Sequence, residues 1–280
     1  MPRRNYTISY SPGSFTINKA VLTATPSGAT ATYGDSAPVY GIGVTGFKNS
    51  ETTSTAAGYV APTCTSTYSA TSAVGSSISY TCSGGSATNY TITNSGSGSV
   101  VISKATLTIT PASKSVTYGD AAPTYTFSVS GFKNSETTST ATSYSAPTCT
   151  SSYTTTTNVS ASPLTITCTT PTTVTNYSFT SGSANLTINK VTALTITAST
   201  QSASYGASIT SLYSNSAGFS STGIGGGVIN ALTYTYAGSG STTYAASTTA
   251  PSAPGTYSVT PSAVGFSTGS TGNYNAINYT

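Results

Sequence analysis

The eleven-residue stretch Gly-Phe-Lys-Asn-Ser-Glu-Thr-Thr-Ser-Thr-Ala occupies residues 46–56 and recurs without a change at residues 131–141. A peptide that returns intact further along a chain indicates that the chain is built from copies of one module. Two flanking motifs keep nearly the same spacing, and they are Tyr33-Gly34-Asp35 with Tyr118-Gly119-Asp120, and Asn89-Tyr90 with Asn176-Tyr177. A period of about 85 residues is the size of an immunoglobulin-type sandwich, not of a helical hairpin or a propeller blade.

This period divides the chain into a short leading piece and three modules. Residues 1–18 match the end of a repeat, so we expect them to be terminal strands of a preceding repeat or a strand for donation to another copy. Repeat 1 is predicted at residues 19–103 and repeat 2 at residues 104–189. Residues 190–280 keep the Tyr-Gly and Asn-Tyr pairs but not the eleven-residue peptide, which predicts a divergent third repeat that lacks its last strand.

Alternating side chains predict β-strands in every module. In repeat 2, for example, Leu107/Ile109, Leu164/Ile166 and Leu186/Ile188 place apolar residues at every second position, with Ser and Thr between them. No apolar series has the 3.6-residue spacing of a helix. The predicted fold class is therefore all-β, a tandem array of three immunoglobulin-like β-sandwich modules. Very few residues separate one module from the next, which leaves no flexible linker and predicts an elongated rod.

The composition excludes several kinds of partner. Charged residues make up 4% of the chain and the formal net charge is +4, which is too dilute for contact along a nucleic-acid backbone. No window approaches the eighteen or so apolar residues that span a bilayer. We therefore expect no nucleic-acid partner and no membrane insertion in this segment. Solubility must come from the many uncharged Ser and Thr residues.

The sequence contains few residues of the types that carry out catalysis. The chain has no histidine, and its four acidic residues are Asp35, Glu51, Asp120 and Glu136, one matched pair in each of the first two repeats. Because a catalytic site needs convergent groups with tuned pKa values, we expect no enzyme, no cofactor and no metal site. The Tyr-Gly-Asp triplets are expected to be turns whose aspartate accepts backbone N–H bonds, in preference to calcium ligands. Lys48 and Glu51 are expected to form a solvated pair.

The four cysteines fall at matched positions in the first two repeats. The presence of two cysteines per module, both on predicted strands, indicates disulfides within the modules. The expected pairs are Cys64 with Cys82 and Cys149 with Cys168. The alternative is buried free thiols in a reducing compartment. Zinc is not expected, because the spacing is unsuitable and no histidine could complete the site. Disulfides of this kind favour an extracellular location.

The motifs together resemble a known family. The series Asn-Tyr-Thr-Ile-Ser-Tyr-Ser-Pro-Gly-Ser-Phe-Thr-Ile-Asn-Lys-Ala begins at Asn5, and Thr-Tyr-Gly-Asp and Gly-Phe-Lys-Asn-Ser-Glu-Thr follow it. It is similar to the MBG-type immunoglobulin-like repeats of large bacterial cell-surface proteins and adhesins. The similarity covers residues 5–189, whereas residues 190–280 resemble a related subtype more loosely. It implies β-sandwich spacers or adhesive modules outside the cell, without catalytic residues. The cysteines and the sparse charge depart from the family's common pattern.

The expected function is that of an extracellular structural or adhesive segment at the cell surface, such as a stalk, filament or adhesin. Either the chain is one stretch of a longer array, or residues 1–18 complete the open third module of another copy, which would polymerise the chain head to tail. The expected partners are other copies or adjacent repeats, and host or surface glycans. The alternative is a carbohydrate-binding or enzyme-appended accessory module that uses exposed tyrosines. The identical peptide either contacts a neighbour or records a recent duplication.

Overall fold

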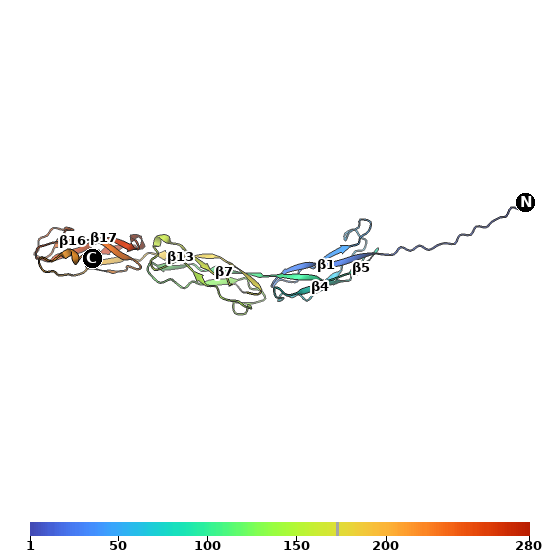
Figure 1. Cartoon of the computed structure of the whole chain (residues 1–280), viewed down its shortest axis with the longest axis horizontal. Coiled ribbons are helices and arrows are strands. Elements are labelled where there is room, and N and C mark those ends of the chain that lie inside the picture. The colour runs from blue at the N-terminus through green and yellow to red at the C-terminus, as the bar shows by residue number, and fades with distance from the viewer. Residues whose placement is uncertain (172–173) are drawn as a thin grey trace. The chain divides into compact units, whose positions relative to one another are not determined.

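The computed structural model describes residues 1–171 and 174–280, and β-strands make up nearly all of its regular structure (Figure 1). The helical elements of the described residues are three short 3₁₀ turns, η1 (Val159–Ala161), η2 (Ile209–Ser211) and η3 (Thr271–Asn273). The predicted all-β class is confirmed. It follows from the alternating Thr, Val, Ile and Tyr residues, because these side chains pack well on a pleated surface that is half buried.

Repeat 1 is organised around one long strand that changes partners along its length. Its strands are β1 (Ala20–Thr32), β2 (Gly41–Thr45), β3 (Thr63–Ser66), β4 (Ile78–Ser83), β5 (Tyr90–Asn94) and β6 (Gly98–Ser103). The first part of β1 pairs with β2 and, in parallel, with β5, whereas the last part pairs in parallel with β6. The change falls at Gly28, where the register with β2 shifts and φ is +101°, a conformation that glycine adopts without strain.

Repeat 2 has the same pairings with the long strand divided in two. Its strands are β7 (Ala105–Pro111), β8 (Lys114–Thr117), β9 (Phe127–Ser130), β10 (Cys149–Thr150), β11 (Leu164–Cys168), β12 (Tyr177–Ser181) and β13 (Ser183–Asn189). They form two sheets, β12-β7-β9 and β10-β11-β13-β8. Strand β13 lies between β11 and β8, and its Leu186 and Ile188 are almost fully buried. Alternation therefore directs one face of each strand to the core, as expected for period-2 spacing.

Residues 190–280, the C-terminal segment, form two smaller sheets. Its strands are β14 (Leu194–Ala198), β15 (Phe219–Thr222), β16 (Val228–Gly238), β17 (Tyr257–Thr268) and β18 (Ile277–Tyr279). The sheet order is β15-β14-β18 in one sheet and β16-β17 in the other. Strands β14 and β18 pair in parallel, as β1 and β5 do in repeat 1.

The chain packs into two compact units whose limits differ from those of the repeats. Unit 1 contains Met1–Ala105, Phe132–Ser143 and Val174–Ser178, and unit 2 contains Thr106–Gly131, Tyr144–Thr173 and Phe179–Thr280. Unit 1 thus joins repeat 1 to two loops of repeat 2. Unit 2 joins the rest of repeat 2 to the C-terminal segment, and one continuous core runs through it, with Ile166 and Ile196 fully buried.

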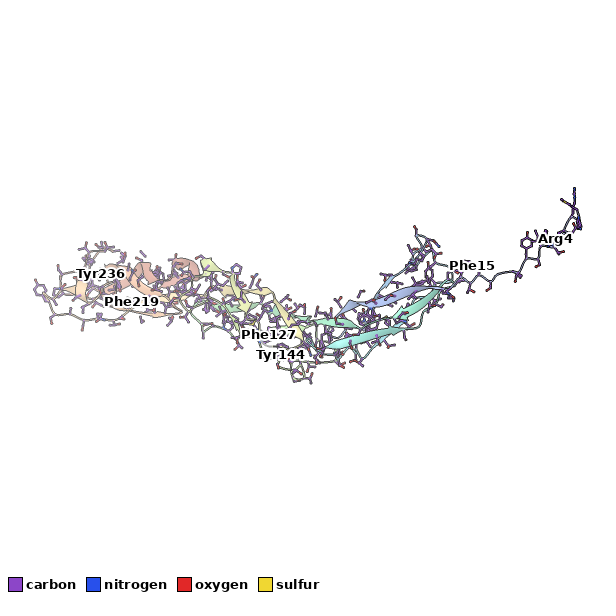
Figure 2. All side chains as sticks on the ribbon, turned by 45° about the vertical axis from the view of Figure 1, so that its right-hand side comes forward. Arg4, Phe15, Phe127, Tyr144, Phe219 and Tyr236 are labelled. Atoms are coloured by element: carbon purple, nitrogen blue, oxygen red, sulfur yellow. A yellow bond between two sulfur atoms is a disulfide. The ribbon has the colours of Figure 1, made fainter. Side chains whose placement is uncertain are left out.

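The N-terminal segment forms no strand before β1. Tyr6, Ile8, Tyr10, Phe15 and Ile17 are all exposed, and the expectation that residues 1–18 are terminal strands of a preceding repeat or a strand for donation stays a prediction. Figure 2 shows Arg4 and Phe15 on an extended stretch of chain. A two-stranded hairpin is marginal in water without a third strand or a packed face, and the described residues offer it neither.

Candidate functional site

The Tyr-Gly-Asp triplet of repeat 1 forms a turn at the end of β1, beside the end of β6. The Tyr33 amide donates to the Ser103 carbonyl oxygen at 2.9 Å, and the Asp35 amide donates to the Thr32 carbonyl oxygen at 3.0 Å. Ser103 immediately precedes Lys104, the first residue of repeat 2. The turn is therefore held at the point where the chain passes from repeat 1 to repeat 2.

The eleven-residue peptide of repeat 2 forms a hydrogen-bonded loop after β9. The Lys133 amide donates to the Tyr177 hydroxyl oxygen at 2.9 Å, and that hydroxyl donates to Glu136. The Thr137 amide donates to Thr140 Oγ1 at 2.8 Å, which closes the tip of the loop. The glutamate of the peptide therefore accepts a hydrogen bond from a buried tyrosine. Within the described residues it forms no ion pair with Lys133, three positions before it.

The peptide of repeat 1 adopts the same conformation. The Lys48 amide donates to the Tyr90 hydroxyl oxygen at 3.0 Å, and Tyr90 donates to Glu51. The Thr52 amide donates to Thr55 Oγ1 at 2.8 Å. The predicted solvated ion pair between Lys48 and Glu51 is wrong, because within the described part of the chain Glu51 bonds to Tyr90 instead. Identical sequences thus build two identical loops, each anchored on the tyrosine of an Asn-Tyr pair.

Within unit 1, the loop of repeat 2 holds the Tyr-Gly-Asp turn of repeat 1. Tyr33 donates its hydroxyl hydrogen to Glu136 Oε1 at 2.9 Å. Its ring meets the ring of Tyr177 edge to face, with centroids 5.5 Å apart and planes at 83°. The Lys133 ammonium lies 3.0 Å from Asp35 Oδ1. The expected role of Asp35 as an acceptor of backbone N–H bonds is therefore wrong in this structure: its amide forms the turn, and its carboxylate pairs with a lysine of the next repeat.

Two further hydrogen bonds complete this contact. Asn134 Nδ2 donates to the Ala70 carbonyl oxygen at 3.0 Å, and the Val74 amide donates to Asn176 Oδ1, also at 3.0 Å. Asn176, the asparagine of the Asn-Tyr pair, thereby accepts a hydrogen bond from a backbone N–H group of repeat 1. We name the set of loop residues 131–141 with Asn176 and Tyr177 the socket of repeat 2, and residues 46–56 with Asn89 and Tyr90 the socket of repeat 1.

The exposed fractions of the side chains indicate how much the aromatic pair and the ion pair each contribute to the stability of this contact. Tyr33 and Tyr177 are 4% and 2% exposed, so their edge-to-face pair adds about 0.5–1.5 kcal/mol beyond the area that it buries. The side chains of Lys133 and Asp35 are 39% and 48% exposed, and an ion pair that exposed contributes under about 1 kcal/mol. Burial, followed by the hydrogen bond to Glu136, raises the pKa of the Tyr177 hydroxyl to about 12. The buried aromatic pair therefore contributes more to the stability of this contact than the exposed ion pair does.

Gly34 is required by the close approach of the two repeats. A Cβ atom at this position would lie 2.3 Å from Lys133 Cβ, a distance that real Cβ atoms do not show. The φ of Gly34 is +85°, which side-chain-bearing residues rarely adopt. Two separate features therefore require a glycine in the middle of the triplet. They are the positive φ of the turn and the close approach of Lys133 from the neighbouring repeat.

Unit 2 holds a related contact built from different residues. The Tyr118 amide donates to the Asn189 carbonyl oxygen at 2.9 Å, and its ring meets Tyr274 at 6.0 Å and 84°. The Val159 amide donates to Asn273 Oδ1 at 2.9 Å, as Val74 does to Asn176. A Cβ at Gly119 would lie 2.4 Å from Gly225 Cα, so the glycine loop of the C-terminal segment occupies the place that Lys133 takes in unit 1.

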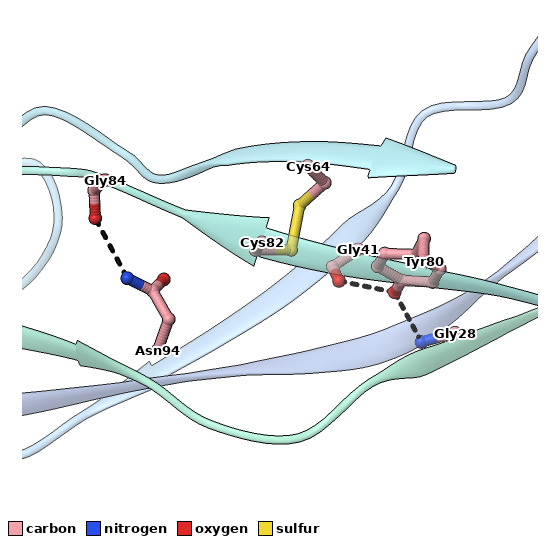
Figure 3. Close-up of a disulfide and its surroundings, with 7 residues drawn as sticks. All are labelled: Gly28, Gly41, Cys64, Tyr80, Cys82, Gly84 and Asn94. Atoms are coloured by element: carbon pink, nitrogen blue, oxygen red, sulfur yellow. Dashed lines mark hydrogen bonds between the residues drawn. A yellow bond between two sulfur atoms is a disulfide. The ribbon is translucent and has the colours of Figure 1, made fainter. Parts of the chain in front are cut away.

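The two disulfides reinforce the same strand pair in each repeat. Cys64 of β3 is bonded to Cys82 of β4, and Cys149 of β10 to Cys168 of β11, with each pair directly opposite in register. Figure 3 shows the first bond beside Tyr80, whose hydroxyl accepts from the Gly28 amide at 2.8 Å and donates to the Gly41 carbonyl at 2.7 Å. The disulfide therefore braces β4, whose Tyr80 also bonds to Gly28, the residue at which β1 changes partners.

In the described part of the chain, no group of three or more Cys, Asp or Glu residues could hold a metal ion. The described residues also contain no helix with the length and apolar character to cross a membrane. Lys104 Nζ donates to the Val174 carbonyl oxygen at 2.9 Å, and Lys19 Nζ to that of Ala87 at 3.5 Å. These lysines thus hold their own repeats together.

The fold and the socket define a class: tandem β-domains in which a Tyr-Gly-Asp turn of one domain docks on a loop of the next. The family model described as MBG domain (YGX type) matches residues 22–99 and 107–187, which together are more than half of the chain. The chain therefore belongs to the MBG domain family of the YGX type, and both Tyr-Gly-Asp triplets lie in the matched residues. Neither the curated proteins nor the solved structures gave a significant match.

Proposed function

We propose that this chain is a structural segment of an extracellular surface protein, in which three immunoglobulin-like modules stack in a fixed order and act as a stalk, filament or adhesin shaft. The observation that carries the proposal is the socket: the Tyr33 turn of repeat 1 is held by Glu136, Tyr177 and Lys133 of repeat 2. A chain that needed only to tether its domains would not require complementary side chains at the junction. Partners in this role are adjacent repeats, other copies and surface glycans.

Two further features support an extracellular role. Disulfides persist in oxidising surroundings, and each of the first two repeats carries one across a strand pair. A chain with 4% charged residues and abundant Ser and Thr loses little stability when the salt concentration changes, because it has few ion pairs for salt to screen. Both properties suit a mechanical element outside the cell. We do not assign an enzymatic role to it.

The test measures whether the socket sets the geometry of the junction. Spin labels carried on unnatural residues that do not react with cysteine replace Val39 of repeat 1 and Thr138 of repeat 2, both of which are exposed and belong to unit 1. We expect a narrow distribution of label distances in the unaltered protein and a broad one in a Tyr33→Ala, Lys133→Ala double variant. Tyr205→Ala, which removes a ring that is 83% exposed, is the matched control and should leave the distribution narrow. A broad distribution in the unaltered protein would contradict the proposal.

The location is tested separately on intact cells that express the full protein. Antibody or protease access to the repeats on unbroken cells is the expected result. Access only after lysis would contradict the extracellular assignment. Binding of a glycan array that disappears with exposed-tyrosine variants, and not with Tyr33→Ala, would favour the accessory carbohydrate-binding module instead.

A further inference from the structure

In repeat 1 the first strand and the last two strands lie side by side and run in the same direction. The first part of β1 pairs in parallel with β5, and the last part pairs in parallel with β6. Ala20, the first residue of β1, lies opposite Tyr90, and Thr32, the last, lies opposite Ser103. Figure 1 shows β1 and β5 next to each other. We call these paired segments, residues 20–32 and 90–103, the parallel ladder of repeat 1.

The direction of the ladder determines how tension acts on repeat 1. The chain enters the repeat at Ala20, the start of β1, and leaves it after Ser103, the end of β6. Because Ser103 lies opposite Thr32, the entry and the exit are at opposite ends of β1. Tension on the chain therefore draws β1 and β6 in opposite directions along their length and shears the ladder. Shear loads the evenly spaced hydrogen bonds of parallel strands together, whereas peeling would break them one after another.

Non-covalent contacts alone hold the ladder together. On its other side β6 pairs antiparallel with β4. Val100 and Ile102 of β6 are 3% and 5% exposed, so β6 cannot slide past β1 without moving buried side chains. The disulfide between Cys64 and Cys82 joins β3 to β4 and lies outside the ladder. It therefore limits how far an unfolded repeat extends, but it does not link β1 to β6.

The Tyr-Gly-Asp turn of repeat 1 lies at the end of this ladder. The Tyr33 amide extends the ladder by donating to the Ser103 carbonyl oxygen at 2.9 Å. The Tyr33 side chain is held by repeat 2, through its hydroxyl bond to Glu136 and its ring contact with Tyr177. β6 is joined covalently to repeat 2 through Lys104. If β1 slides towards the N-terminus while β6 stays with repeat 2, Tyr33 must therefore leave the socket of repeat 2.

Repeat 2 combines the same two features with different residues. Its last strand, β13, pairs in parallel with β8, and Asn189 lies opposite Thr117. The Tyr118 amide extends this ladder by donating to the Asn189 carbonyl oxygen at 2.9 Å. The Tyr118 ring then meets Tyr274 of the C-terminal segment. A parallel last strand and a turn held by the following module thus occur together in both repeats, which indicates that they act together.

We propose that the parallel ladder of each of the first two repeats bears tension along the chain, and that the Tyr-Gly-Asp turn is a latch that prevents the ladder from sliding while the next module holds the turn. The proposal deepens the proposed function, because it assigns the mechanical resistance of the stalk to named strands and one turn. It has a directional consequence. Unfolding of repeat 2 frees Tyr33 and weakens repeat 1, so each folded module protects the one before it.

Single-molecule stretching of the full 280-residue protein in two geometries tests the ladder. One variant carries an unnatural residue for tethering in place of Val39, which is 94% exposed and lies between the Tyr-Gly-Asp turn and β2. Tethers at the two termini shear the ladder. Tethers at residue 39 and the C-terminus leave β1 outside the path of tension, so repeat 1 should then unfold at a clearly lower force. Because the molecule is the same, a difference in its equilibrium stability cannot produce this result.

The latch is tested with tethers at the two termini. Tyr33→Ala removes the bond to Glu136 and the ring contact, and it should raise the unfolding rate of repeat 1 at a given force at least about tenfold. Tyr59→Ala is the matched control, because it removes a partly buried ring that packs on the core of repeat 1 from outside the ladder. For the same loss of stability in denaturant, the control should raise the rate under tension much less.

The disulfide identifies which unfolding event belongs to repeat 1. Cys64→Ala, Cys82→Ala releases a loop with a sequence separation of 18, so only that event should lengthen, by about 60 Å. Equal unfolding forces in the two geometries would overturn the role of the ladder.

Equal effects of Tyr33→Ala and Tyr59→Ala at matched stability would overturn the role of the latch. The spin-label test measures the geometry of the junction without tension. A narrow label distribution together with equal forces would therefore overturn this proposal and leave the proposed function standing, so the two fail separately.

Discussion

Tyr33 and Glu136 are 103 residues apart in the chain and are joined by a hydrogen bond of 2.9 Å. The same carboxylate also accepts from Tyr177, so it links a turn of repeat 1 to the anchor of a loop in repeat 2. A bond between such distant residues makes the stability of each repeat depend on the other. Four consequences can be measured.

Removal of the Tyr33 ring should destabilise the junction more than removal of its hydroxyl. Tyr33→Phe leaves the edge-to-face contact and loses one hydrogen bond to a carboxylate, a cost of about 1.5–3 kcal/mol. Tyr33→Ala also loses the buried ring, and we expect about 3–5 kcal/mol in the free energy of unfolding. Chemical denaturation measures both. Equal losses for the two variants would show that the ring packing contributes nothing.

Gly34→Ala should cost more than the left-handed backbone alone explains. Gly75→Ala is the matched control, because Gly75 has a similar φ of +82° but no heavy atom within 4 Å of the position that a Cβ atom would take. The control should lose about 1 kcal/mol from backbone strain. Gly34→Ala should lose at least about 1–3 kcal/mol more, the cost of overpacking, since Lys133 Cβ stands 2.3 Å from the new atom. Thermal melting of the two variants gives the comparison, and equal shifts would contradict the close approach.

Stability should fall in alkaline solution as Tyr177 ionises. Burial and the bond to Glu136 raise the pKa of Tyr177 from 10.0 to about 12 in the folded protein. The folded state then holds this proton more tightly than the unfolded state, so the contribution is complete below pH 10 and is lost as the pH rises towards 12. The free energy of unfolding, measured from about pH 9 to pH 12, should decline less steeply for Tyr177→Phe. An unchanged slope in that variant would contradict the assignment.

Loss of one disulfide should weaken its own repeat and spare the C-terminal segment. The bond between Cys64 and Cys82 closes a loop with a sequence separation of 18, which corresponds to about 3 kcal/mol in the loop-entropy model. Cys64→Ala, Cys82→Ala should therefore speed amide exchange in β3 and β4. Residues 190–280 contain no cysteine, and their exchange should not change. Faster exchange there as well would show that unfolding of the two regions is coupled.

Much of the architecture could be predicted from local patterns. Alternation at positions such as Leu107 and Ile109 specifies strands, because each side chain's face depends only on its place in the strand. The recurring peptide and the Tyr-Gly-Asp triplets also predicted tandem repeats, and the MBG family model matches two of them. The direct opposition of Cys64 and Cys82 follows the same local logic, since both lie on neighbouring strands of one repeat.

The partners of the charged residues could not be predicted in this way. Lys48 and Glu51 are close in sequence, which favoured a pair, yet the glutamate binds Tyr90, and the matching lysine of repeat 2 binds Asp35. The Tyr-Gly-Asp triplet and the eleven-residue peptide recur with the same spacing. This recurrence does not show that the triplet of one repeat contacts the peptide of the next. A contact across 98 residues depends on where β6 ends and how the next repeat begins.

The sequence by itself determined the strands, the two repeats and the two loops of identical shape, because each depends on side chains that are near one another in the chain. Only the tertiary structure decided that the Tyr33 turn enters the loop at residues 131–141 and that the Tyr118 turn meets Tyr274. Those outcomes depend on which surfaces come into contact at the ends of the repeats. The alternation of side chains along a strand does not predict such contacts, because the residues involved are far apart in the chain.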